Sequence, residues 1–249
     1  VNSDRFVLMD VKSAEMSKYV ANALLATKIS FMNEIANICE KVGANVKNVR
    51  LGIGSDKRIG YDFIYAGCGY GGSCFPKDVK ALIKSGKEEN FDFKILEATE
   101  YINKKQKVIL VDEIEKYFGG NIEGKKIAMW GLAFKANTDD IREASSLDNI
   151  ELILEKGAQV VAYDAIAEEN VRKILGDKIE YAKDMYSALE GADCLLIATE
   201  WSEFKNPNFE LMASKLKNKV IFDGRNMFSM EQAEGSGFFY KSIGRKTVR

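Results

Sequence analysis

The chain has 249 residues, of which 46% are hydrophobic and 29% are charged, and its formal net charge at pH 7 is -1. This composition is ordinary for a soluble globular protein, and the near balance of charge argues against a nucleic-acid-binding protein, which normally carries a basic excess. No apolar run approaches the roughly 20 residues that span a bilayer, so the sequence predicts no membrane segment.

The chain contains no histidine and 4 cysteines. Without imidazole, a Ser-His or Cys-His catalytic triad is impossible and most zinc sites are excluded, so we expect no metal site. Any acid–base chemistry must come from Asp, Glu, Lys, Tyr or water. The cysteines are scattered without a disulfide framework, which is typical of a reducing compartment, and we expect a cytoplasmic protein.

The first predicted element is a helix from Ser13 to Gly43. This stretch has no proline or internal glycine, and its apolar residues recur three and four positions apart. Ser13 is a suitable N-cap and Gly43 a suitable C-terminal stop. A helix of about 30 residues is far longer than average, and it is typical either of a subunit interface or of the buried spine of one domain. A short helix is expected next, near Val46.

The stretch "GCGYGGSCFPKD", residues 67–78, combines several glycines with two cysteines and one of the 2 prolines of the chain. Pro76 predicts a helix start, and the following pattern ends at Gly86. Cys74 then lies at the mouth of this helix, where unpaired N–H groups and the helix dipole favour an anion, and Lys77 adds positive charge. The glycines let a ligand approach the sulfur closely, so we predict an exposed, activated thiol at Cys74. The other cysteines are expected to be small buried hydrophobic residues: Cys39, Cys68 and Cys194.

A second long helical pattern runs from Phe91 to Phe118, and "GGNIEGK" reads as a turn-like linker. Short apolar runs and helical stretches alternate after it, which predicts a parallel sheet with covering helices. The expected strands are "KIAMWG", "QVVAYD", "DCLLIAT" and "KVIFDG", and the helices begin near Ser145, Ala167, Asp184 and Phe209. We therefore expect an all-helical domain over 1–118, a linker over 119–125 and an α/β domain over 126–249.

Ligands of such sheets bind beyond the carboxyl ends of the strands. The first of these ends carries "GLAFKANTDDIR" and the last carries "DGRN". The first turn lacks the GxGxxG fingerprint, and Lys135 stands where phosphate-cradling glycines are expected, so a dinucleotide site is only weakly supported. The pattern is consistent with a nucleotide held partly by Lys135 and Arg225, and equally with two surface cations on loops.

The motifs "SAEMSKYVANALLATKISFMNE", "DKRIG", "GCGYGGSCFPKD", "GLAFKANTDDIREASS" and "DGRN" resemble, in order and spacing, those of the UDP-glucose 6-dehydrogenase family of nucleotide-sugar dehydrogenases. The resemblance covers residues 8–244. It implies an NAD-dependent oxidation of a primary alcohol, carried out twice, through an aldehyde and a cysteine thioester to the acid. It also implies a helical domain that forms a homodimer, followed by a Rossmann-like parallel α/β domain that binds the nucleotide sugar, UDP-glucose.

Members of this family begin with an NAD-binding Rossmann domain, which this sequence lacks. We therefore expect NAD to be bound mainly by that missing domain, and the absence also accounts for Val1 in place of an initiator methionine. The residues present are expected to bind UDP-glucose weakly and not to reduce NAD by themselves.

The resemblance implies catalytic roles for four residues. Cys74 matches the nucleophile. Lys18 and Asn22, four apart and hence on one face of the first helix, match residues that hold an ordered water and stabilise oxyanions. Asp78 matches a carboxylate that supports base chemistry during hydrolysis, and it is also a favourable acid in the first turn of its helix.

Binding roles follow from the same resemblance. The residues implied to shape the sugar loop or to meet the uridine diphosphate are Phe63, Ile64, Tyr65, Ala66, Gly67, Tyr70, Gly71, Lys135 and Arg225. Arg58 matches an arginine offered across the dimer to the neighbouring subunit's substrate. Lys77 and Arg142 match residues that touch the phosphates or ribose of NAD.

Two alternatives remain open. GDP-mannose dehydrogenases usually have leucine where this chain has Phe75, which favours UDP-glucose as the substrate, and the UDP-N-acetylmannosamine enzymes carry a histidine that this chain lacks. A different class of function is a non-catalytic module for nucleotide-sugar binding or dimerisation.

Overall fold

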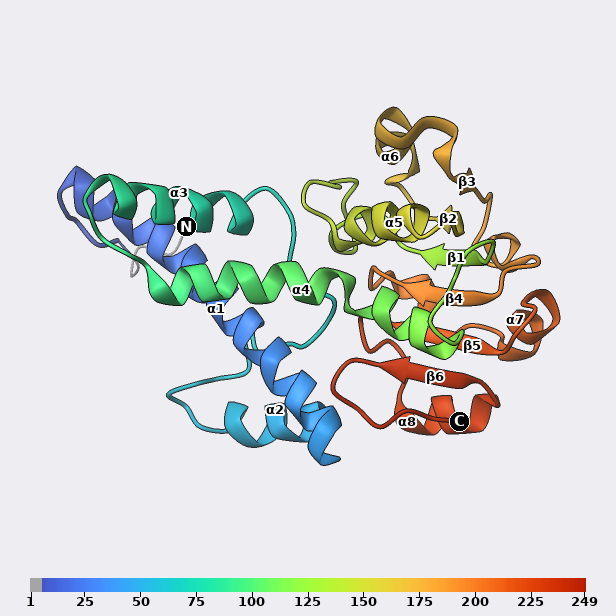
Figure 1. The fold of residues 1–249 in the computed structure, drawn as a ribbon. Coiled ribbons are helices and arrows are strands. Elements are labelled where there is room, and N and C mark those ends of the chain that lie inside the picture. The colour runs from blue at the N-terminus through green and yellow to red at the C-terminus, as the bar shows by residue number, and fades with distance from the viewer. Residues whose placement is uncertain (1–5) are drawn as a thin grey trace.

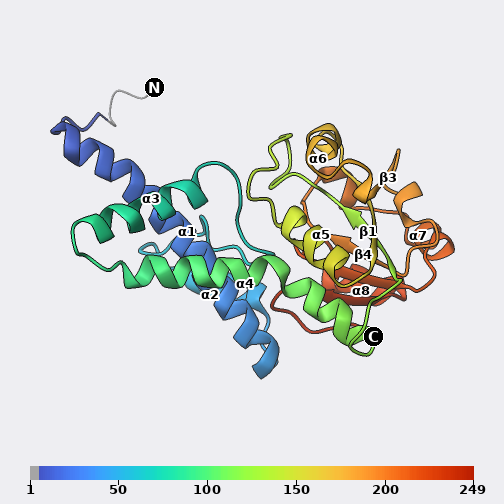
Figure 2. The same cartoon turned by 45° about the horizontal axis from the view of Figure 1, so that its top comes forward.

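A computed structural model of the chain describes residues 6–249, so Val1 lies outside the described residues. The first part is all-helical and the second is a sheet covered by helices (Figure 1). The helices of the first part are α1 (Val11–Val42), α2 (Val46–Gly54), α3 (Phe75–Glu88) and α4 (Lys94–Tyr117). Figures 1 and 2 both show α3 beside the N-terminal half of α1, with α4 crossing α1, and these three helices contact one another.

The long first helix is confirmed, but its predicted N-cap is wrong. α1 begins at Val11, and the carboxylate of Asp10 accepts the backbone N–H of Ser13 at 3.0 Å. Ser13 is therefore already helical, because Asp10 satisfies a free N–H of the first turn. Gly43 ends the helix in the left-handed conformation, φ 76°, as predicted.

The apolar residues of α1 divide between two sides of the helix. Ala23, Ala26, Met32 and Ala36 are buried against the rest of the chain. A second set recurs at spacings of four and seven, which places its members on one side of a helix. These residues are between 48% and 69% exposed, and we call them the α1 apolar face: Val20, Leu24, Phe31, Ile38 and Val42.

The second part contains six parallel strands. They are β1 (Lys126–Trp130), β2 (Gln159–Tyr163), β3 (Glu180–Tyr181), β4 (Cys194–Ile197), β5 (Val220–Asp223) and β6 (Phe239–Ser242). Their order in the sheet is β3-β2-β1-β4-β5-β6. This is the strand order of doubly wound nucleotide-binding folds, so the Rossmann-like prediction is confirmed.

The covering helices are α5 (Ser145–Glu155), α6 (Glu168–Leu175), α7 (Phe209–Lys215) and α8 (Met230–Ser236), with single 3-10 turns over Gly176–Lys178, Ser187–Leu189 and Ser202–Phe204. The helix expected near Asp184 is wrong. The Asp184 carboxylate accepts the N–H groups of Tyr186 and Ser187 at 2.9 and 2.8 Å, which closes a tight turn in place of a longer helix. Two strands were not predicted: β3, which has only two residues, and β6.

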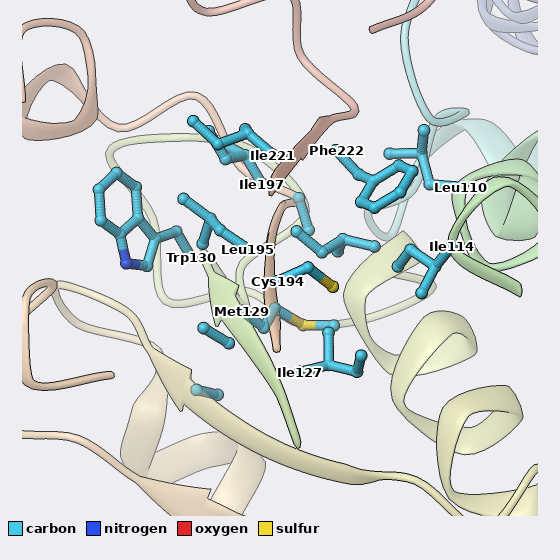
Figure 3. Close-up of a cluster of buried hydrophobic side chains, with 14 of the residues drawn as sticks. Leu110, Ile114, Ile127, Met129, Trp130, Cys194, Leu195, Ile197, Ile221 and Phe222 are labelled. Carbon is cyan, nitrogen blue, oxygen red and sulfur yellow. The ribbon is translucent and has the colours of Figure 1, made fainter. Parts of the chain in front are cut away.

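One apolar core spans both parts of the chain. The last turns of α4 bring Leu110 and Ile114 against Met129, Cys194 and Phe222 of the sheet (Figure 3). All five side chains are at most 1% exposed. The end of α4 therefore packs as one of the helices that cover the sheet.

Within residues 6–249, no helix is both long enough and apolar enough to cross a membrane.

Candidate active site

Cys74 is the exposed cysteine among four free thiols, and it forms the N-cap of α3. Pro76 is the second helical residue, because α3 begins one residue earlier than predicted, at Phe75. The helix also runs past Gly86 to Glu88. Both Lys18 and Arg142 lie within electrostatic range of the Cys74 sulfur.

Asp78 lies one turn into α3 and has a fully buried side chain. Its Oδ2 accepts hydrogen bonds from Lys18 Nζ at 2.8 Å and from Asn22 Nδ2 at 2.6 Å. Lys77 Nζ lies 3.8 Å from Oδ1, which makes no hydrogen bond. The structure therefore brings four of the implied residues together beside Cys74.

The charges around Asp78 are mutually stabilising. Burial alone raises the pKa of the Asp78 carboxyl, but the hydrogen bonds from Lys18 and Asn22 and the charges of Lys18 and Lys77 outweigh it, so this pKa is lowered. The hydrogen bond to Asp78 raises the pKa of Lys18. The site therefore holds an ion pair at neutral pH.

The segment over residues 67–74, which we call the glycine loop, is held by buried amide side chains of the helical part. The Tyr70 N–H donates to Asn103 Oδ1 at 2.8 Å, and Asn103 Nδ2 donates back to the Tyr70 carbonyl at 3.1 Å. The Gly67 N–H donates to Asn33 Oδ1 at 2.9 Å, and Gln106 Nε2 donates to the Gly67 carbonyl at 2.8 Å. These amides were not singled out from the sequence, although a polar residue at a core position of an apolar helix is the signal that marks them.

The same loop is also hydrogen-bonded to the α/β part. The Cys68 N–H donates to the Gly224 carbonyl at 2.9 Å, and the Gly72 N–H donates to the Arg142 carbonyl at 2.7 Å. The loop that carries Cys74 is thus fixed to both parts of the chain.

A pocket of about 480 Å³ lies at this junction. The loop lines it with Phe63, Tyr65, Ala66, Gly67, Tyr70 and Gly71, followed by Phe75 of α3. The α/β part contributes Phe134, Lys135, Glu200 and Arg225. Apolar walls with two cations suit a nucleotide sugar, in which a base and sugar flank two phosphates.

Arg225 is held firmly in this wall. Its Nε donates to the Ala198 carbonyl at 2.8 Å and its Nη2 to the Phe134 carbonyl at 3.2 Å. Glu200 Oε2 lies 3.3 Å from Arg225 Nε. Phe134 and Glu200 were missed by sequence reasoning, because each is a neighbour of a motif residue and carries no spacing signal of its own.

Four predicted binding residues lie outside this pocket, among them Lys77, whose side chain is 70% exposed beside Asp78. Ile64 is buried and faces a neighbouring cavity of about 400 Å³, which shares Tyr65, Ala66 and Arg225 with the first. The Arg58 side chain is 88% exposed and pairs with Asp56 at 2.5 Å. The Arg142 side chain is 67% exposed and pairs with Asp140 at 2.7 Å, near the thiol but away from the pocket lining.

The first turn of the sheet is filled by the protein's own groups. Asp164, at the end of β2, accepts the N–H groups of Leu132 and Ala133 at 2.6 and 3.0 Å and the Trp201 indole N–H at 3.0 Å. A Cβ on Gly131 would lie 2.3 Å from the Thr199 side chain. The residues do not fit a dinucleotide here, despite the strand order. The described residues contain no group of three or more Cys, Asp or Glu side chains placed to hold a metal ion.

Comparisons with known proteins agree with this arrangement. Residues 12–105 match the model for the central domain of the UDP-glucose/GDP-mannose dehydrogenase family, and residues 128–230 match the model for its UDP binding domain. Among curated relatives, UDP-glucose 6-dehydrogenase of Pseudomonas aeruginosa is 46% identical over 249 residues, with 98% of this chain and 55% of the relative covered. UDP-glucose 6-dehydrogenase TuaD of Bacillus subtilis is 49% identical over 240 residues, with 96% and 52% covered.

A solved structure of a UDP-glucose dehydrogenase from Pyrobaculum islandicum superposes with a TM-score of 0.87 at 34% identity, with 96% of this chain and 53% of that chain covered. The chain spans about half the length of the curated relatives it matches. The two family models match successive parts of one chain, in the order of the helical and α/β parts. The chain belongs to the UDP-glucose/GDP-mannose dehydrogenase family.

Proposed function

We propose that this chain is the thiol-bearing and nucleotide-sugar-binding part of a UDP-glucose 6-dehydrogenase. The intact enzyme would oxidise UDP-glucose to UDP-glucuronate in two steps through a thioester on Cys74. The observation that carries this proposal is an exposed thiol one helical turn before a buried carboxylate that pairs with Lys18 and Asn22. NAD would accept one hydride in each of the two oxidations.

In the addition of the Cys74 sulfur to the aldehyde, the residues around Cys74 would have distinct roles. After the first oxidation, the sulfur adds to the aldehyde carbon and the carbonyl oxygen takes up negative charge. Lys18 and Asn22 each use one donor on Asp78, which leaves two N–H groups of the ammonium and one of the amide free. Those donors can stabilise the oxyanion in place, which is the largest contribution that such sites usually make.

Hydrolysis of the thioester requires a positioned water. The second hydride leaves the carbon that bears the sulfur, a thioester results, and water attack then releases the carboxylate and the Cys74 thiol. Oδ1 of Asp78 makes no hydrogen bond and is buried, so it has an acceptor site for this water only if the water is enclosed within the site of the intact enzyme. The neighbouring ammonium of Lys18 offsets the negative charge that develops in this step.

The nucleotide sugar is proposed to occupy the 480 Å³ pocket. Lys135 and Arg225 would meet the diphosphate, and the loop over 63–67 with Gly71 would shape the sugar subsite. Tyr70 would contribute its ring, because its hydroxyl already donates to Glu100 at 2.8 Å. Arg58, exposed and outside its own chain's pocket, would reach the substrate of a partner subunit in a homodimer.

NAD is proposed to be held mainly outside this chain. The turn after β1 is filled by protein groups, so the cofactor has no cradle in the α/β part. Lys77 and Arg142 are exposed cations near Cys74, where they would meet its phosphates or ribose. A reducing cytoplasm suits an enzyme that depends on a free thiol.

The test pairs calorimetric titration of UDP, UDP-glucose and GDP with a nicotinamide absorbance assay on these 249 residues. We expect UDP binding that is tighter than GDP binding, with no absorbance change. Loss of the cofactor's positioning can remove on the order of 10 kcal/mol from catalysis, so binding would not restore turnover. Preference for GDP would favour the mannose alternative, and no binding of either nucleotide would contradict the proposal.

A further inference from the structure

The side chain of Glu143 joins two helices, α3 and α4. Its Oε1 lies 2.8 Å from Lys80 Nζ of α3, and its Oε2 lies 3.0 Å from Lys107 Nζ of α4. Glu143 itself lies two residues before α5 of the α/β part. Lys107 is 6% exposed and has a second carboxylate partner, Asp148, at 3.1 Å. One carboxylate therefore bridges the helix that begins at Cys74 to the rest of the molecule.

The backbone of Glu143 holds the glycine loop as well. A Cβ on Gly71 would lie 2.1 Å from the Glu143 carbonyl oxygen, so the two backbones touch. Glu143 has φ of 53°, a conformation that costs free energy in a residue with a side chain. Such a conformation persists only where surrounding contacts enforce it, and the two lysines and the loop supply those contacts.

The bridge is charged at neutral pH. The hydrogen bond from Lys80 lowers the pKa of the Glu143 carboxyl, with a further contribution from Lys107, and these outweigh the opposing effect of burial. The same hydrogen bond raises the pKa of Lys80.

We infer that Glu143 is a positioning residue, which keeps the loop before Cys74 and the start of α3 in register with the nucleotide pocket. This inference rests on the proposed function, because the bridge matters for activity only if Cys74 is the reacting thiol. By itself the Lys80–Glu143 pair, with side chains 55% and 43% exposed, would contribute at most about 1 kcal/mol and fix only two side chains. Its effect on the loop comes from the combination with buried Lys107 and with the backbone contact to Gly71, which hold the same loop and helix from two directions.

Two variants separate this mechanical role from a simple charge effect. Glu143→Gln removes a negative charge and Lys80→Met removes a positive one, yet both release α3 from the bridge. Through-space electrostatics would move the reactivity of Cys74 in opposite directions in the two variants. Release of the loop would move it in the same direction. The matched control is Glu88→Gln, which removes the exposed pair between Lys84 and Glu88 on the same helix, 3.9 Å apart.

The readout is the second-order rate of Cys74 alkylation by iodoacetamide, mapped by peptide, with and without UDP-glucose. Without ligand, we expect both E143Q and K80M to accelerate labelling by roughly threefold or more, within the range that coupling through packed networks produces. With saturating UDP-glucose, we expect protection in the wild type and in E88Q and weaker protection in both bridge variants. Unfolding midpoints measured on the same samples show that the folded protein is being labelled.

Ligand-free rates equal to wild type in both variants, or changes of opposite sign, would overturn the positioning role. Failure of UDP-glucose to bind the wild type would instead count against the proposed function, and the ligand-free rates would still decide the role of Glu143.

Discussion

Asp78 is a fully buried carboxylate whose stability depends on two donors from another helix. Burial of a charge without partners is costly, and here the hydrogen bonds from Lys18 and Asn22 reverse the effect of burial on its pKa. The pairing ties α3 to α1 one helical turn after the thiol. At the scale of single residues, the atoms that stabilise this site are therefore the same atoms to which we assign the proposed chemistry.

Asp78→Asn should lower the free energy of unfolding at pH 7 by about 1–3 kcal/mol, because the neutral amide loses the ion pair with Lys18 and accepts weaker hydrogen bonds than a charged carboxylate does. The folded-state pKa of Asp78 lies below its unfolded value of about 3.9, so this contribution is complete above that pH and is lost as pH falls through the folded value. The difference between variant and wild type in denaturant titrations should shrink accordingly. Asp112→Asn, at an exposed position of α4, is the control. A difference that stays constant from pH 7 to strongly acidic pH would contradict this.

Cys74 should be the first thiol to react with a limiting amount of iodoacetamide at neutral pH. The other three thiols are buried, and burial raises the pKa of Cys39 and of Cys194. Peptide mapping identifies the labelled residue, and Cys74→Ser should remove the fast phase. Faster labelling of Cys39, Cys68 or Cys194 would show that access and charge at the start of α3 do not activate the thiol.

At the scale of elements, the glycine loop depends on close contact between backbones. Gly71→Ala should destabilise the fold by about 1–3 kcal/mol and weaken UDP binding, because its Cβ would meet the Glu143 carbonyl. Gly52→Ala in α2 is the matched control, since that Cβ would meet open space and alanine favours a helix by up to about 1 kcal/mol. Thermal unfolding and UDP titration measure both effects. An unchanged midpoint for the Gly71 variant would mean that the loop can move away from Glu143 without cost.

The elements that could be predicted from the sequence are those with long periodic patterns. The spacing of apolar residues along α1 and the apolar runs of β1, β2, β4 and β5 depend only on local order, and they were predicted correctly. The amide side chains that hold the glycine loop, such as Asn103, could not be predicted, because each forms its hydrogen bond with a residue more than 30 positions away. The contacts of Glu143 could not be predicted for the same reason, since its lysine partners lie on α3 and α4. The exposure of Cys74 at the start of α3 could be predicted because its signals are all local.

At the scale of the whole molecule, we predict self-association through the α1 apolar face. Five half-exposed apolar side chains on one side of a helix form a surface that a monomer rarely presents to water. We expect a homodimer in sedimentation velocity at micromolar concentration. The double substitution L24K/F31K should give monomers, whereas Ile174→Lys, at an equally exposed apolar position on α6, should not. A monomeric wild type, or dimers in the double variant, would contradict this interface.

The packing of α4 limits where the chains of two related proteins can be recombined. The turns that carry Leu110 and Ile114 complete the core beneath β4 and β5, although they precede the linker. A recombination event in the linker would therefore separate a sheet from one of its own covering helices and leave apolar side chains of both in water. The folding unit of the α/β part therefore begins inside α4. Chimeras between relatives should accordingly fold when joined before Leu110 and aggregate when joined at 119–125.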